Sequence, residues 1–406
     1  MSLTTRMLGA LAAGVVLGAL LAGLAPGGPL TTADVVGALW LNALRMTIVP
    51  LVFAMLVTGA ATAAATAAAG GIAARALAVF VVLLVAGAVF GVVATEVLLA
   101  WSPITPEGIA AIRAGLDAAG GALPQVAPLS EWVTGLVPAN PLRAAVEDAM
   151  VPLVVFALLF GFAAARLREE MRDRLVGFFQ ALAEAMLVLV HWVLLLGPVG
   201  VFALAFALGV RVGLGAAGAL VHYVLVIVAV CLMLTLAVYA FVMLARLDVR
   251  AFARAAAAGQ VVGFSTQSSL AALPAMVEGS QQHLGVPSRV TGLVLPLAVS
   301  LFRITSPAAN LAVVLYLASF YGLEPSVAHV VAAVGVAVVV SLGAVSLPGQ
   351  VSFLASCVPI SMALGVPIAG LPLLLAVESI PDIFRTVGNV TADVAVTGIV
   401  AGRQAD

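Results

Sequence analysis

The sequence contains no lysine, and every basic residue is an arginine. Charged residues make up only 9% of the 406 residues, and 17 basic residues balance 18 acidic ones. Such a near-zero net charge gives no electrostatic basis for binding nucleic acid. A soluble domain of this length would need far more charge on its surface. Lipid, rather than water, is therefore the predicted solvent of most of the chain.

Cysteine is almost absent as well. Cys231 and Cys357 both lie in apolar runs, which argues against a disulfide framework and against a cysteine-based metal site. The sequence also lacks a Ser–His–Asp arrangement and the HExxH, CxxC and phosphate-loop patterns that would indicate an enzyme. We therefore expect neither catalysis nor a bound cofactor, and no metal site is indicated with certainty.

Hydrophobic residues, in contrast, make up 64% of the chain. A membrane-spanning helix needs about 20 mostly apolar residues, and long apolar runs recur along the sequence. The first run follows Arg6 and has features of a signal peptide, but the runs after it favour an uncleaved first helix. The predicted spans are residues 7–25, 37–62, 76–100, 146–165, 176–206, 217–245, 288–320 and 367–402.

Arginines cluster between these runs, at 166–174 and again at 246–254, and they also occur singly near both ends. Cytoplasmic loops of membrane proteins carry an excess of basic residues, so both termini are predicted to be cytoplasmic. The Pro- and Gly-containing loop 101–145 then faces outward. The expected location is the cytoplasmic (inner) membrane of the cell, with the chain crossing it several times.

Two stretches do not fit simple spans. Residues 251–279 have a polar centre, Ser265-Thr266-Gln267-Ser268-Ser269, and residues 326–366 have Ser346-Leu347-Pro348-Gly349-Gln350 between apolar flanks. Irregular backbone at membrane depth must line a cavity or be buried in protein, and paired interruptions of this kind point to a midplane binding site. The alternative is a helix kinked at Pro348 and a serine-rich packing seam.

The last apolar segment carries charges at helical spacing. Glu378, Asp382, Arg385, Asn389 and Asp393 fall within about 80° of one another on a helix. Burying four charges on one face of a membrane helix costs on the order of 10 kcal/mol before pairing offsets it. The face therefore needs partners, water or a ligand, unless the charges only pair with one another.

Each side chain of this face suits one part of a ligand. Arg385 can hold a carboxylate through two parallel N–H bonds, and Asp382 suits a substrate ammonium group. Asn389 and Asp393 offer hard oxygens one turn apart, which suit a small cation. Together these residues predict a site for a zwitterion with an additional carboxylate, that is, an acidic amino acid.

At these residues the chain resembles the dicarboxylate/amino acid:cation symporters, the glutamate transporter family. The pattern Asp-x-x-Arg-Thr-x-x-Asn-Val-Thr-x-Asp of that family is matched from Asp382 to Asp393. Further matches are Met46-Thr-Ile-Val-Pro50-Leu-Val-Phe53, Leu182-Ala-Glu184-Ala-Met186, Pro198-Val-Gly-Val-Phe202, Ser268-Ser269 before Leu273-Pro274, and Pro348-Gly349.

The resemblance implies an all-α membrane protein with eight transmembrane helices, two re-entrant helical hairpins and inverted repeats, working as an elevator-type homotrimer. It implies a scaffold and trimerisation domain of residues 1–70 and 141–210. The transport domain would comprise residues 71–140 and 211–406, with hairpins at about 249–285 and 325–366. Substrate contacts carried over by position are Ser269, Ser306, Leu347, Val351, Asp382, Arg385, Thr386 and Asn389, with Leu347 and Val351 acting through backbone groups.

The chain departs from the family where sodium would bind. The family's Asn-Met-Asp-Gly-Thr is replaced by Phe302-Arg303-Ile304-Thr305-Ser306, and residues 76–94, which should add hydroxyl ligands, are apolar. Losing one carboxylate and gaining one guanidinium makes the site more positive by two charges. Arg303 is therefore expected to replace a bound cation, paired with Asp393, or else to contact the substrate and favour a dianion.

These observations predict a secondary active transporter of acidic amino acids such as aspartate or glutamate. Substrate binding is expected to be sodium-independent, and transport is expected to be proton-coupled or to run as exchange. Glu378, Asn389 and Asp393 are the candidate groups for proton or cation coupling, H⁺ or Na⁺ being the coupling ions considered. The expected partners are a small acidic solute, the lipid bilayer and further copies of the chain. The alternatives are a C4-dicarboxylate transporter, and an anion-conducting channel or substrate sensor with the same fold.

Overall fold

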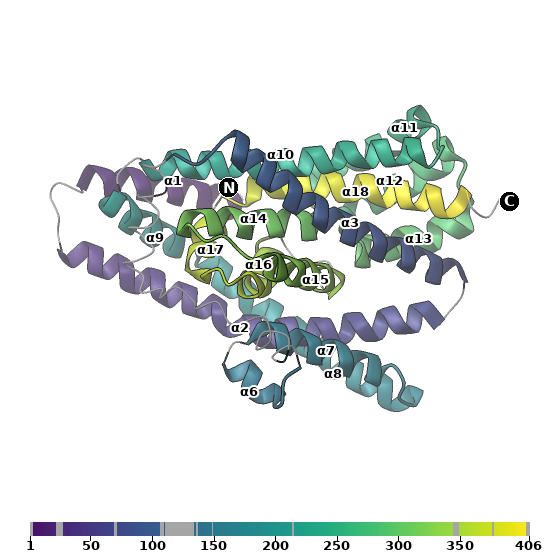
Figure 1. The fold of residues 1–406 in the computed structure, drawn as a ribbon, viewed down its shortest axis with the longest axis horizontal. Helices are drawn as coiled ribbons and strands as arrows, with labels where there is room; N and C mark the ends of the chain where they lie inside the picture. The colour runs from purple at the N-terminus through teal and green to yellow at the C-terminus, as the bar shows by residue number, and fades with distance from the viewer. Residues whose placement is uncertain are drawn as a thin grey trace.

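The computed structural model describes residues 3–21, 27–68, 71–105, 109, 134, 137–147, 149–212, 215–343, 349–375 and 377–402. Every regular element in these ranges is a helix, as the sequence predicts (Figure 1). The helices are α1 (Leu3–Leu21), α2 (Gly27–Ala68), α3 (Gly71–Trp101), α6 (Pro141–Val146), α7 (Met150–Ala164), α8 (Glu169–Leu195), α9 (Gly197–Val212), α10 (Gly215–Leu244), α11 (Val249–Thr266), α12 (Ser269–Leu284), α13 (Ser288–Leu301), α14 (Thr305–Tyr321), α15 (Val327–Gly343), α16 (Gly349–Leu364), the 3₁₀ helix η2 (Ile368–Gly370), α17 (Leu371–Leu375) and α18 (Ser379–Gly402). Most of the predicted outward loop, residues 101–145, lies outside the described residues.

Five helical stretches of the described chain are long and apolar enough to cross a membrane: residues 71–101, 169–195, 218–244, 288–321 and 379–402. Shorter apolar helices lie in α1, α2, α7, α9, α15 and α16. Helix α2 has 42 residues, and at 1.5 Å per residue it is about 63 Å long, roughly twice the thickness of a hydrocarbon core. The predicted span 37–62 is therefore the middle of a much longer helix.

The predicted span 176–206 is not a single helix. It is divided between α8 and α9, with Leu196 between them. Pro198 is the second residue of α9, and a proline ring clashes with the carbonyl group of the residue four positions earlier in a continuous helix. That residue is Leu194, so the break falls where Pro198 requires it.

Helix pairs lie where the two hairpins are predicted. Helices α11 and α12 pack against each other within the predicted range 249–285, and α15 and α16 do so within 325–366. Gln267 has a left-handed backbone conformation (φ 54°), and the Ser268 hydroxyl caps α12 by accepting from the amide of Ala271. The predicted tip of the second hairpin, including Leu347 and Pro348, lies outside the described residues.

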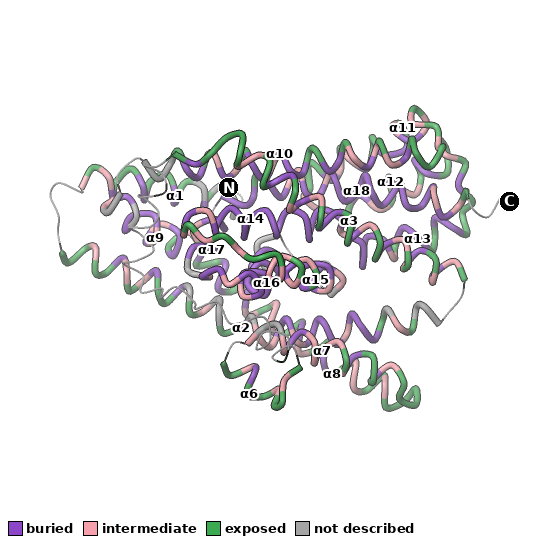
Figure 2. The backbone as a smooth tube through the Cα atoms, in the orientation of Figure 1, coloured by how far each residue is buried: buried purple, intermediate pink, exposed green. Residues whose placement is uncertain are grey.

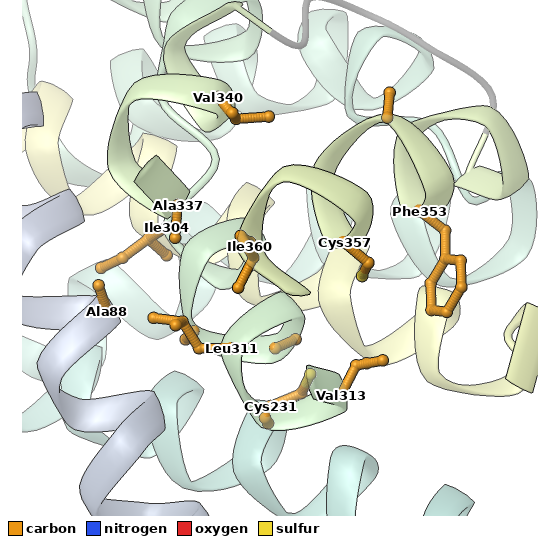
Figure 3. Packing of buried hydrophobic residues seen from close by; sticks show 14 of the residues in the cluster. Ala88, Cys231, Ile304, Leu311, Val313, Ala337, Val340, Phe353, Cys357 and Ile360 are labelled. Carbon is orange, nitrogen blue, oxygen red and sulfur yellow. The ribbon is translucent and has the colours of Figure 1, made fainter. Parts of the chain in front are cut away.

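Helix α14 is the centre of the molecule. Nearly all of its residues are buried, as expected for a helix that is apolar on every side. It packs against α3, α10, α15, α16 and α18, and Figure 3 shows side chains of α3, α10, α15 and α16 gathered around Leu311 and Val313. Gly91 permits α3 to approach closely, because a Cβ there would collide with the backbone of Ala308.

The other helices are arranged around this centre. In Figure 1, α10, α11, α12 and α18 lie along one side of the molecule, while α2, α7 and α8 lie along the other. Helices α1 and α9 pack closely together, and α2 contacts α7, α8 and α9. Figure 2 shows that α18 and α14 are mostly buried, whereas α6 and α8 have long exposed stretches. The charged face of α18 is therefore inside the protein.

Candidate functional site

Helix α18 begins one residue after Glu378, the first charged residue of the predicted face. The carbonyl oxygen of Glu378 accepts from the amide of Asp382 at 3.0 Å, and this bond opens the helix. Pro381 lies in the first turn, where backbone amides have no partner within the helix, so its lack of an N–H costs no hydrogen bond. An acidic side chain is favoured near a helix N-terminus because the free amides carry a partial positive charge there.

The start of α14 lies beside α18, next to Arg385 and Asn389. The chain leaves the helical conformation at Phe302 (φ −111°, ψ 97°) and enters α14 at Thr305. Pro307 accounts for this break, because its ring would clash with the carbonyl group of Arg303 in a continuous helix. The predicted span 288–320 is thus two helices, α13 and α14, with Arg303 in the irregular segment between them.

Arg385 is engaged by groups from several helices. Its Nη2 lies 2.8 Å from Oε1 of Glu378, and the two side chains are 8% and 2% exposed. Its Nη1 donates to Oδ1 of Asn310 on α14. The hydroxyl of Tyr223 on α10 donates to Oε2 of Glu378 at 2.9 Å. The Nε and Nη2 of Arg385 are buried and donate no hydrogen bond among the described residues, so Glu378 and Arg385 form an ion pair by distance without a hydrogen bond.

Three other charged groups on or beside α18 have no partners among the described residues. Arg303 is half-buried, and Asp382 is buried at 8% exposure; neither side chain forms an ion pair or a hydrogen bond within the described part of the chain. Asp393 is fully buried, and neither of its carboxylate oxygens has a hydrogen-bond partner among the described residues. The pairing of Arg303 with Asp393 considered from the sequence is therefore not formed in this structure.

Asn389 stabilises the start of α14. Its Oδ1 accepts from the amide of Thr305 at 3.0 Å and lies 2.9 Å from the hydroxyl of the same residue. That hydroxyl is also 2.9 Å from the carbonyl oxygen of Arg385. These bonds satisfy one of the free amides at a helix N-terminus. The side chain oxygen that the sequence assigns to a ligand is thus already used to join α18 to α14.

The remaining predicted substrate contacts lie at different distances from this cluster. Ser306 belongs to it through Asn310, whose amide donates to the Ser306 hydroxyl at 3.2 Å. Thr386 uses its hydroxyl within α18, on the carbonyl oxygen of Asp382. Ser269 is the first residue of α12, and Gln267, two residues before it, donates to the carbonyl oxygen of Ser379 at 3.3 Å. Val351 lies at the start of α16, and Leu347 is outside the described residues.

Sequence reasoning missed Asn310, Tyr223 and Thr305. Asn310 follows Ser306 by four residues, so the two share one face of an otherwise apolar helix, and this spacing was an available signal. Tyr223 reaches Glu378 from 155 residues away, a contact that no local pattern in the sequence indicates.

The cluster holds two guanidinium groups, of Arg303 and Arg385, and three carboxyl groups, of Glu378, Asp382 and Asp393. Only the pair Arg385–Glu378 is in contact within it. Unpaired charges of both signs in a buried site can hold the opposite charges of a ligand, and their burial is unfavourable unless something offsets it. The arrangement is therefore suited to binding a solute that carries both signs of charge.

A separate cavity of about 160 Å³ lies between α3, α10 and α18, and Ile304 forms part of its wall. Its other lining residues are apolar: Leu83, Ala86, Gly87, Phe90, Leu234, Ala237, Val238, Phe241, Ala392, Ala395 and Val396. A cavity lined in this way offers no group that could hold an acidic solute.

Residues 3–403 match the family described as "Sodium:dicarboxylate symporter family". The chain belongs to this family. Membership of a symporter family, together with the five long apolar helices, makes the chain a multi-pass membrane protein of a transporter family. It also agrees with the resemblance seen in the residues of α18.

Members of the family with similar sequences carry different substrate names. A proton/glutamate-aspartate symporter of Escherichia coli (strain K12) is 26% identical over 90% of this chain and 84% of its own length. A proton/sodium-glutamate symport protein of Bacillus caldotenax is 25% identical over 93% of this chain and 89% of its own length. A C4-dicarboxylate transport protein of Azorhizobium caulinodans is 24% identical, over 98% and 88%. Similarity at this level leaves the choice of substrate to the residues of the site.

Proposed function

We propose that this protein is a secondary active transporter of acidic amino acids such as aspartate or glutamate. The observation that carries the proposal is the buried carboxylate of Asp382, which has no partner among the described residues and lies one helical turn before Arg385. A cation-binding and an anion-binding group at this spacing suit the ammonium and carboxylate groups of one amino acid. The names of the glutamate and aspartate symporters above support the same substrate class.

In this proposal Arg385, Thr386 and Asn389 of α18 contact the substrate together with Ser306. Ser269 and the backbone of Leu347 and Val351 cover it from the two helix pairs. These pairs would be re-entrant hairpins, and the chain would cross the cytoplasmic (inner) membrane eight times. Three copies would assemble through the scaffold of residues 1–70 and 141–210. The transport domain of residues 71–140 and 211–406 would move past that scaffold as an elevator.

Substrate binding is proposed to be independent of sodium. Arg303 supplies a fixed positive charge near the site and has no counter-ion within contact among the described residues. Ile304 contributes a hydrocarbon wall rather than an oxygen ligand, and α3 is apolar where it faces this wall. Proton coupling or exchange would then replace sodium coupling. Glu378 or Asp393 would carry the proton, and Asn389, which carries no charge, would lie between them in sequence, on α18.

Transport of a C4-dicarboxylate is the second candidate, and the observation that favours it is the unpaired Arg303. Two guanidinium groups can hold the two carboxylates of a dianion, and the similar transport protein of Azorhizobium caulinodans carries that substrate name. Asp382 argues against it, since a dicarboxylate offers no ammonium group to this carboxylate.

Uptake by proteoliposomes containing the purified protein tests the proposal. Aspartate and glutamate are expected to accumulate, and succinate is not. The Asp382→Asn variant should lose amino acid uptake, because the ammonium group loses its counter-charge, whereas the matched change Glu184→Gln on the exposed face of α8 should retain it. Uptake of succinate in preference to aspartate would favour the second candidate, and counterflow without accumulation would indicate an exchanger. Flux of inorganic anions without accumulation would point to a channel.

A further inference from the structure

Arg385 already holds a carboxylate in this structure, and it is one of the protein's own. Glu378 approaches Nη2 at 2.8 Å, Nη1 is used by Asn310, and Nε has no acceptor within the described chain. A carboxylate binds a guanidinium most strongly through two parallel N–H bonds. Neither Nε nor Nη2 donates a hydrogen bond among the described residues, so the edge that they form is open to such binding. Oε1 of Glu378 lies beside this edge, within ion-pair distance of Nη2.

We propose that Glu378 is an internal competitor for the substrate carboxylate, and that it must take up a proton from water before the substrate can bind to Arg385. This inference rests on the proposed function and adds its coupling step. In the substrate-free protein Glu378 is ionised and paired with Arg385. On binding, the proton adds to Oε1 of Glu378, the ion pair breaks, and the substrate carboxylate accepts from Nε and Nη2.

The charge balance around Arg385 favours protonation of Glu378 on binding. Before binding, one guanidinium faces one carboxylate; afterwards it faces the substrate carboxylate while Glu378 is neutral, so the local charge is unchanged. If Glu378 stayed ionised, two buried carboxylates would share one guanidinium, and the uncompensated charge would oppose binding. Each substrate molecule whose carboxylate binds Arg385 therefore brings one proton into the protein.

Tyr223 allows Glu378 to exist in both states. Its hydroxyl donates to Oε2 at 2.9 Å, the oxygen that does not face Arg385, so this bond can persist when Oε1 carries the proton. The other titratable groups in electrostatic reach of Glu378 are Asp382 on α18, Cys231 on α10 and Cys357 on α16. Asp382 forms no ion pair with Arg385, so its protonation would not free the guanidinium.

Calorimetric binding of aspartate in sodium-free buffers of different ionisation enthalpy tests the proposal. The unmodified protein should take up about one proton per aspartate at a pH where Glu378 is ionised. In that range its affinity for aspartate should fall about tenfold for each unit by which the pH rises. Glu378→Gln should take up none and should bind with an affinity that no longer depends on pH in that range. Glu184→Gln, a matched change on exposed α8, should behave as the unmodified protein does.

A second variant guards against loss of folding in Glu378→Gln. Glu378→Asp keeps a titratable group but shortens its reach to Arg385, so it should still take up a proton with a shifted pH midpoint. Proton uptake that persists in Glu378→Gln, or an unshifted midpoint in Glu378→Asp, would overturn the assignment to Glu378. Aspartate binding without proton uptake at any pH would overturn the coupling step but leave the proposed function intact. An absence of binding by any acidic amino acid would instead refute the proposed function.

Discussion

Arg385 and Arg303 differ in what surrounds them. Arg385 is buried among Glu378, Asn310 and Tyr223, so its guanidinium is held in one orientation. Arg303 lies in an irregular segment, is half-buried and has no ion pair among the described residues. A fixed guanidinium suits directional binding of a carboxylate, whereas a free one acts mainly through its charge.

Replacing Arg385 with lysine should reveal the directional contribution. Lysine keeps the positive charge but cannot form two parallel bonds while also reaching Asn310. We expect the affinity for aspartate to fall about tenfold or more, equivalent to about 1.4 kcal/mol. Equilibrium binding measures this change, and Arg254→Lys on the exposed face of α11 is the control. Unchanged affinity in Arg385→Lys would mean that Arg385 contributes charge alone.

Replacing Arg303 with methionine tests its role as a fixed cation. The variant removes one positive charge near Asp382 and Asp393, which leaves the site more negative and open to a cation from solution. We expect aspartate binding to become weaker without sodium and to recover partly in about 100 mM sodium chloride, as linkage to a bound ion requires. The affinity of the unmodified protein for aspartate should change less than about tenfold between the same two conditions. A tenfold or larger gain with sodium in the unmodified protein would contradict the proposed sodium independence.

At the scale of helices, α1 and α9 show how small residues determine packing. Gly14 and Gly18 on α1 are four residues apart, and a Cβ at either would collide with backbone atoms of α9 near Phe202 and Phe206. In a membrane, close backbone approach between small residues is a main source of helix association. The contact between α1 and α9 therefore depends on these glycines.

The Gly18→Leu substitution should separate these two helices. We expect a lower midpoint of thermal unfolding in detergent, because large side chains cannot be accommodated without moving α9. Gly9→Leu is the matched control, since Gly9 lies on the same helix and a Cβ added there would meet no atom within 4 Å. Equal effects of the two substitutions would show that the close contact adds no stability.

The same scale shows which features a sequence can and cannot predict. The charged face of α18 was predictable because charges are rare in an apolar segment and their spacing is regular. The two helix pairs were predictable from polar residues at their centres. The breaks at Leu196 and Phe302 were missed, although Pro198 and Pro307 account for both. Residues 75 apart join in the Arg385–Asn310 bond, and such contacts follow from the packing of whole helices rather than from local pattern.

At the scale of the whole molecule, the number of copies can be measured. We expect three chains of 40.8 kDa, about 122 kDa in all, by native mass spectrometry in detergent. The long helix α2 and the exposed apolar residues Trp192, Leu195 and Val199 near the junction of α8 and α9 offer surface for contacts with lipid or with other copies. A mass of one chain under conditions that preserve substrate binding would contradict the proposed homotrimer.

The driving force of transport follows from the charges of the site. If Arg303 replaces a bound sodium ion and each substrate brings a proton to Glu378, then an inward proton gradient should drive accumulation of aspartate with no sodium present. Dissipating that gradient with a protonophore should abolish accumulation but leave exchange of labelled for unlabelled aspartate, since exchange needs no net proton movement. Glu378→Gln should retain exchange and lose gradient-driven accumulation, because its site can no longer release the proton. Accumulation driven by a sodium gradient at constant pH would contradict this prediction and return the coupling role to a metal cation.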